Sequence, residues 1–154
     1  MKVRDIMHPG VLSVRDDMPL RELAALLIHH KISGAPVVDA EGRPQGVVAL
    51  SDLVAHAAGL DTPKEGGFLT DLWAAPHPVE ELHLNESAVA RDIMTSFVVR
   101  VQEDAELTEL IDLVCEAHLH RVLVTNGDRL TGIVSTIDLV AQLGKILKKE
   151  AIEK

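Results

Sequence analysis

The chain has 154 residues, and its 15 Lys or Arg against 24 Asp or Glu give a formal net charge of −9 with histidine neutral. Apolar residues make up 47% and charged residues 25%, which is ordinary for a globular protein and excludes a chain that is disordered along its whole length. The negative net charge argues against nonspecific binding of nucleic acid. The single Cys115 cannot form an internal disulfide, no apolar run reaches the roughly 18–20 residues of a membrane helix, and no secretory signal opens the chain, so we expect a cytoplasmic protein.

The sequence contains an internal repeat. Arg4-Asp5-Ile6-Met7 recurs 87 positions later as Arg91-Asp92-Ile93-Met94, and residues 3–38 match residues 90–125 at 12 of 36 positions. Ordinary composition predicts roughly one chance match in fifteen positions. After a one-residue deletion in a turn, residues 46–55 match residues 132–141 at six of ten positions. A unit of roughly 55 residues has therefore been duplicated.

Each copy predicts five elements in the order β-α-β-β-α. In the first copy, a strand at 11–14 precedes a helix in which Leu20, Leu23, Ala24 and Leu27 recur at the 3.6-residue spacing of one buried face. Its remaining elements are strands at 35–38 and 47–50 and a closing helix at 51–58.

The second copy predicts the same elements. Its first helix has Leu107, Leu110, Ile111 and Val114 on the expected buried face, and Cys115 falls beside Ile111, so we expect that cysteine to be a small buried hydrophobe. The other elements are strands at 98–101, 122–124 and 130–134, a tight turn at 126–128 that contains Asn-Gly, and a closing helix at 136–149.

The expected fold class is α+β. Each unit is too small to bury both faces of its sheet, so we expect the two repeats to pack sheet to sheet about a pseudo-twofold axis. The expected boundaries are 1–58 for the first repeat, 59–88 for a connector, 89–147 for the second repeat and 148–154 for a C-terminal tail. In the connector, Phe68, Leu72 and Trp73 either pack onto the core or contact a partner.

Three features together resemble the CBS (cystathionine β-synthase) domain family, and more narrowly a stand-alone tandem CBS-domain pair. The first is the Arg-Asp-Ile-Met opening of both copies. The second is the strand at 34–39, matched more loosely at 121–125. The third is the signature Gly-x-x-[Ser/Thr]-x-x-Asp, which is complete from Gly132 to Asp138, whereas the first copy, from Gly46 to Asp52, has Ala49 at the hydroxyl position.

The acidic residue of this signature has two interpretations. It lies in the first turn after a strand ends, where helix N–H groups and the helix dipole attract anions. An ionised carboxylate only accepts hydrogen bonds, so Asp52 and Asp138 can each hold two vicinal hydroxyls of a ribose. The alternative is that both residues merely cap their helices.

The resemblance implies that adenosine nucleotides, AMP, ADP or ATP, or S-adenosylmethionine bind as regulatory ligands in clefts between the two repeats. One cleft would combine Ser135 and Asp138 with His8, Ser13, Ile32 and Ser33. The other would combine Asp52 with Thr95, Arg100, Leu119, His120 and Arg121. An arginine fork suits phosphate, although a surface salt bridge is the alternative for Arg121.

The sequence predicts no catalytic residues and no metal site, because its eight histidines lack ligand spacing and no nucleophile has a base beside it. The closing helices carry apolar stripes that either cover their own sheets or, as the resemblance implies, form a homodimer. We therefore expect a non-catalytic, nucleotide-sensing regulatory module that acts on a separate, unknown effector protein. The alternative is a structural dimerisation or protein-interaction module without ligand.

Overall fold

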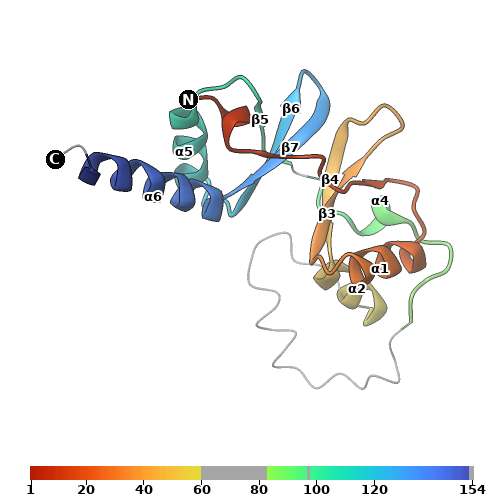
Figure 1. Cartoon of the computed structure of the whole chain (residues 1–154). Helices are drawn as coiled ribbons and strands as arrows, with labels where there is room; N and C mark the ends of the chain where they lie inside the picture. Colours follow the sequence, from red (N-terminus) through yellow and green to blue (C-terminus); the bar gives the residue numbers. More distant parts are fainter. Residues whose placement is uncertain (60–82, 97, 153–154) are drawn as a thin grey trace. The chain divides into compact units, whose positions relative to one another are not determined.

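The computed structural model describes residues 1–59, 83–96 and 98–152 (Figure 1). They form two compact units. The terminal unit contains Met1–Val11 and Val99–Lys154, and the middle unit contains Leu12–Val98. Among the described residues, no helix has the length and apolar character needed to cross a membrane. The connector residues Phe68, Leu72 and Trp73 lie outside the described part of the chain.

The terminal unit has a four-stranded sheet in the order β1-β7-β6-β5. Strand β6 pairs parallel with β5 and antiparallel with β7, and β1 pairs antiparallel with the far edge of β7. In chain order, its elements are η1 (Val3–Asp5), β1 (His8–Pro9), β5 (Arg100–Gln102), α5 (Leu107–Glu116), β6 (Arg121–Asn126), β7 (Arg129–Ser135) and α6 (Thr136–Ile152).

The middle unit has a three-stranded sheet in the order β2-β3-β4, in which β2 and β3 are parallel and β3 and β4 antiparallel. Its elements are β2 (Val14–Arg15), α1 (Leu20–His29), β3 (Gly34–Val38), β4 (Pro44–Ala49), α2 (Leu50–Ala57) and α4 (Ala90–Ile93). Both units therefore contain the predicted β-α-β-β-α order, and the expected α+β fold with two repeats is confirmed.

Each compact unit joins the body of one repeat to the opening segment of the other. The Val3 N–H donates to the Ala105 carbonyl at 3.0 Å, and the Ala90 N–H donates to the Met18 carbonyl at 2.9 Å. These two bonds are equivalent, because both donors and both acceptors are 87 positions apart. The opening segment of the first copy thus continues into β1 on the sheet of the second copy, and Thr95 of the second copy bridges to β4 of the first.

Helix α1 confirms the predicted apolar face, because Leu20, Leu23 and Leu27 are all buried in the core of the middle unit. Burying three leucines contributes roughly 1.5–3 kcal/mol each. In the terminal unit, Leu110 and Val122 occupy the equivalent core.

The predicted burial of Ile111 and Cys115 on α5 is wrong. Ile111 is 40% exposed and Cys115 is also exposed. The buried face of α5 is centred on Leu110, and at 3.6 residues per turn Ile111 is rotated about 100° away from it. Cys115 lies farther round the helix on the same side, so both side chains face outward.

Candidate functional site

The terminal unit places Ser135 and Asp138 at the junction where β7 ends and α6 begins. Asp138 Oδ2 accepts hydrogen bonds from the Ser135 backbone N–H at 2.7 Å and from the Ser135 hydroxyl at 2.6 Å. The Asp138 N–H donates to Ser135 Oγ at 3.3 Å, so the two residues cap the helix reciprocally. Capping therefore occurs, and it occupies one of the two carboxylate oxygens.

His8 contacts the other oxygen of Asp138. Antiparallel pairing of β1 with β7 puts His8 opposite Ile133, two residues before Ser135. The His8 Nε2 atom lies 2.7 Å from Asp138 Oδ1. The Asp138 side chain is 18% exposed and the His8 side chain 68% exposed. Three of the predicted site residues, His8, Ser135 and Asp138, thus meet within one unit.

These contacts keep Asp138 ionised. Burial by itself would raise the pKa of Asp138, but the hydrogen bonds from the Ser135 hydroxyl and N–H, together with His8, outweigh it and hold the pKa below its ordinary value. At neutral pH the site therefore presents a negatively charged carboxylate that accepts hydrogen bonds and donates none.

Asp52 occupies the equivalent position at the start of α2 in the middle unit. Its Oδ2 atom accepts a hydrogen bond from the Ala49 N–H at 2.7 Å, and Ala49 offers no hydroxyl. Asp52 is only 8% exposed. Burial raises the pKa of this carboxyl, and the single Ala49 N–H offsets the effect only in part.

Thr95 stands where the terminal unit has His8. Its backbone exchanges two hydrogen bonds with Val47 in β4, with the Thr95 N–H donating at 2.9 Å and the Val47 N–H donating back at 3.0 Å. The opening segments of both copies therefore run along the edge of the signature strand, but only one of them carries an imidazole.

The carbonyls of Ser33 and His120 also reach these junctions. The Leu50 N–H donates to the Ser33 carbonyl at 2.9 Å, and the Thr136 N–H donates to the His120 carbonyl at 3.0 Å. Ser33 thus lies in the unit that contains Asp52, and His120 in the unit that contains Asp138. Each predicted cleft draws residues from both units, so the two combinations stay predictions.

The remaining predicted site residues are divided between the units. Ser13 and Ile32 belong to the middle unit, where Ile32 packs against the core, and Leu119 packs likewise against the core of the terminal unit. Arg121 is exposed and pairs in register with Ser135 across β6 and β7. Within the described residues, none of the ion pairs involves Arg121.

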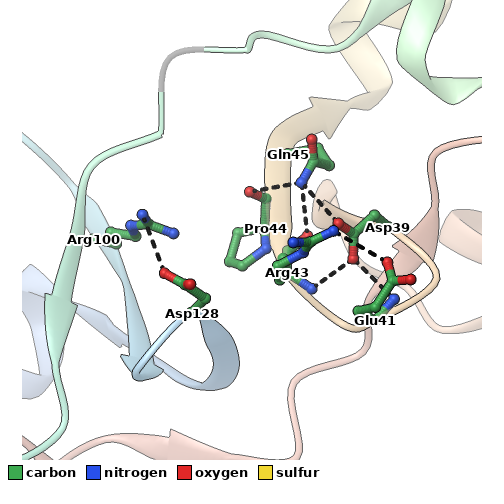
Figure 2. A network of polar contacts seen from close by, with 7 residues as sticks. All are labelled: Asp39, Glu41, Arg43, Pro44, Gln45, Arg100 and Asp128. Carbon is green, nitrogen blue, oxygen red and sulfur yellow. Dashed lines mark hydrogen bonds and ion pairs between the residues drawn. The ribbon is translucent and has the colours of Figure 1, made fainter.

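Figure 2 shows Arg100 engaged elsewhere in the terminal unit, with Nη2 3.8 Å from Asp128 Oδ1 in the β6–β7 turn. The same figure shows the β3–β4 turn of the middle unit, where Asp39 accepts hydrogen bonds from Glu41, Arg43 and Gln45. The Arg43 N–H is the main reason that the pKa of Asp39 lies below its ordinary value. This cluster shapes the hairpin and lies on its turn.

One direct contact in the terminal unit was not predicted from the sequence. The resemblance placed His8 and Asp138 in one predicted cleft, but it did not predict the direct hydrogen bond between them, which depends on the pairing of β1 with β7. A metal site needs more ligands than this pair supplies. Among the described residues, no group of three or more His, Cys, Asp or Glu side chains could hold a metal ion.

In each unit the last strand of the repeat leads into a helix, and an acidic residue caps the start of that helix. The protein is therefore a tandem repeat of one α+β unit. The family model for the CBS domain matches residues 3–59 and 90–145. The chain therefore belongs to the CBS domain family.

The chain is similar to both larger and equally short proteins. It is 27% identical over 153 residues to the zinc metalloprotease MJ0392 of Methanocaldococcus jannaschii, matching 99% of this chain and 35% of that protein. It spans about a third of that relative. A crystal structure of Hypoxic Response Protein I with two coordinated zinc ions has 25% identity and a TM-score of 0.68, with 92% of this chain and 98% of that one covered. A crystal structure of CBSX2 in complex with AMP has 24% identity and a TM-score of 0.68, with 94% and 97% covered.

Proposed function

We propose that this protein is a non-catalytic regulatory module that binds adenosine nucleotides, with Asp52 and Asp138 each holding the vicinal hydroxyls of a ribose. The observation that carries the proposal is shared by both units. In each, the carboxylate is fixed through Oδ2 by the N–H of the last strand residue, Ala49 or Ser135. A carboxylate fixed in this way leaves Oδ1 outside the helix cap, where it can accept from a ligand hydroxyl, and in the terminal unit His8 already contacts this oxygen.

The AMP complex of CBSX2 supports this class of ligand, since that protein has the same fold. AMP, ADP, ATP and S-adenosylmethionine all carry the ribose diol, so the carboxylates alone do not discriminate among them. In the proposed sites, Arg100 and Arg121 supply positive charge, and His120 joins them as a hydrogen-bonding group for phosphate. Ser13, Ile32, Ser33, Thr95 and Leu119 complete the two proposed clefts as described above.

The mechanism we propose is a population shift. A nucleotide that binds one arrangement of the chain more tightly than another raises the population of that arrangement, and a separate effector protein then recognises it. The ligand is released unchanged. The chemistry of the sites fits a binding role, because Asp52 and Asp138 both accept hydrogen bonds at the start of a helix.

A homodimer is part of the proposal, and α6 supports it. No residue of α6 is buried, and Ile137, Val140, Leu143 and Leu147 are each more than half exposed. A stripe of four large apolar side chains on one helix is unusual for a surface that stays in water. This stripe does not cover the sheet of its own unit, which favours the second of the two expectations for this helix.

A thermal-shift screen with AMP, ADP, ATP and S-adenosylmethionine tests the function. A ligand at 100 times its dissociation constant adds about 2.7 kcal/mol of apparent stability. The Asp52→Asn and Asp138→Asn variants, each compared with its own ligand-free form, should lose the part of the shift that belongs to their site. If no nucleotide raises the melting temperature at millimolar concentration, the ligand-free interaction module is the better description.

A further inference from the structure

The two signature carboxylates differ in how much of their hydrogen-bonding capacity is already used. An ionised carboxylate offers about four acceptor positions, two on each oxygen. Asp138 uses three of them, two for Ser135 and one for His8. Among the described residues, Asp52 uses one, for the Ala49 N–H.

A ribose diol needs two acceptor positions, one for each hydroxyl that donates. Within the described residues, three acceptor positions of Asp52 are unoccupied, so a diol that reaches this 8% exposed carboxyl displaces no donor. Asp138 does not offer two positions, because its Oδ2 atom is filled by Ser135 and its Oδ1 atom has one position left beside His8. A diol can bind Asp138 through two hydrogen bonds only if one of the present donors leaves.

His8 is the donor that can leave. The Ser135 N–H is fixed by the backbone at the end of β7, and the Ser135 hydroxyl also accepts the Asp138 N–H in the helix cap. The His8 side chain is 68% exposed, and its strand is held to β7 by backbone pairing opposite Ile133. Rotation of the imidazole away from Asp138 therefore breaks one side-chain contact and leaves the strand in place.

We propose that His8 is a latch on Asp138: it competes with the ribose diol for Oδ1, so the nucleotide site built on Asp52, which has Thr95 at the equivalent position, fills before the site built on Asp138. This inference rests on the proposed function and adds to it an order of filling. It makes His8 a residue that sets the affinity of one site without any need to contact the bound nucleotide.

The test is isothermal titration calorimetry with AMP in an Asp52→Asn background, where only the Asp138 site reports. The variant is His8→Thr, which installs the residue that the other copy carries at this position. His8 is exposed, so releasing its hydrogen bond should tighten AMP binding by the amount expected for an ordinary hydrogen bond, roughly two- to twelvefold. The matched control is His83→Thr, the same change at an exposed histidine of the middle unit, which should leave the dissociation constant unchanged.

The diol is tested with 2′,3′-dideoxy-AMP, which lacks both hydroxyls and should bind wild type and His8→Thr equally. A dissociation constant for AMP that is unchanged or weaker in His8→Thr overturns the latch, and an equal gain with the dideoxy ligand overturns it as well. In either case, loss of AMP binding in the further Asp138→Asn variant leaves the proposed function standing. Absence of AMP binding by the wild-type chain and by His8→Thr at millimolar concentration overturns both the latch and the proposed function.

Discussion

The Met7 thioether lies directly against Gly132, so the opening motif of one copy and the signature glycine of the other form a single contact. A Cβ atom on Gly132 would lie 2.7 Å from Met7 Sδ and 3.0 Å from the His8 carbonyl oxygen. The middle unit repeats this contact, because a Cβ on Gly46 would lie 2.7 Å from Met94 Sδ and 2.6 Å from the Thr95 carbonyl oxygen. The packing of each methionine and of the carbonyl beside it therefore requires a residue without a Cβ atom at this position.

Alanine at either glycine should destabilise the protein. The added Cβ has no room, and the atoms in its way include a backbone carbonyl that cannot rotate aside. Overpacking of this kind costs about 1–3 kcal/mol. We expect the larger loss for Gly46→Ala, whose Cβ would approach the Thr95 carbonyl to 2.6 Å. Urea denaturation of Gly46→Ala and Gly132→Ala measures both.

Gly144 provides the matched control. It lies inside α6, where an added Cβ atom would meet no other atom within 4 Å, so Gly144→Ala should stabilise the chain by about 0.5–1 kcal/mol through helix propensity alone. Equal effects of alanine at Gly46, Gly132 and Gly144 would show that the methionine contacts carry no energetic weight.

The duplication predicts the elements because local patterns determine them. Leu20, Leu23 and Leu27 lie on one helical face in any context, and they are buried. Ile111 shows the limit of the same pattern, since an apolar residue one step from the buried centre looks identical in the sequence whether or not a neighbour covers it. The prediction that Cys115 is buried was wrong for the same reason.

The exchange of opening segments could not be predicted from the repeat. The sequence gives the order of Val3 and Ala105 along the chain, but their hydrogen bond is a choice between two equivalent partners, one in each copy. The His8–Asp138 contact follows from this exchange, because it places β1 beside β7. The burial of Asp52 could not be predicted either. The sequence shows that Ala49 replaces the serine of the other copy and so removes a hydrogen-bond donor, but this does not determine how exposed the carboxylate is.

Asp52→Asn should stabilise the ligand-free chain at neutral pH while it weakens nucleotide binding. Burial raises the pKa of Asp52, so the folded state holds this proton more tightly than the unfolded state does. Stability then falls as the pH rises from the unfolded value near 4 through the higher folded value. The asparagine variant has no such loss, so its advantage should grow with pH across this window and vanish below about pH 4.

Asp138→Asn is the matched control, and its pH dependence has the opposite sign. The pKa of Asp138 is lowered, so its ionised form stabilises the folded state above the unfolded pKa, and this contribution is lost as the pH falls through the folded value. The asparagine variant should be less stable than wild type at pH 7 and approach it in acid. Urea midpoints between pH 3 and 7 measure both variants, and parallel curves for the two would contradict the assigned environments.

Glycine at Lys31 or His118 should stabilise the chain. Both residues adopt the left-handed backbone conformation, with φ of 54° and 50°, at the same position after the first helix of each copy. The following N–H in each case closes the helix end, from Ile32 to the Leu27 carbonyl and from Leu119 to the Val114 carbonyl.

A side chain in this conformation costs about 1–2 kcal/mol, and glycine removes that cost. Glycine also makes the unfolded chain more flexible, which cancels part of the gain. We expect a net gain of about 0.5–1 kcal/mol for each variant in thermal denaturation. Ala24→Gly, inside α1, is the control and should cost about 1 kcal/mol. A loss for Lys31→Gly as large as that for Ala24→Gly would contradict the strain.

Leu143→Glu should separate the proposed homodimer into monomers. Leu143 is 54% exposed near the middle of the apolar stripe on α6, and a buried glutamate in a dimer interface would have no positive partner from the same stripe of Ile137, Val140 and Leu147. Sedimentation equilibrium of wild type and variant gives the mass directly.

The control is Lys145→Glu, which adds more negative charge on the opposite face of the same helix and should leave the mass of the assembly unchanged, because that face stays in water. Equal masses for wild type and Leu143→Glu at every concentration would exclude this helix face as the interface, and dissociation by Lys145→Glu alone would place the interface on the charged side of α6.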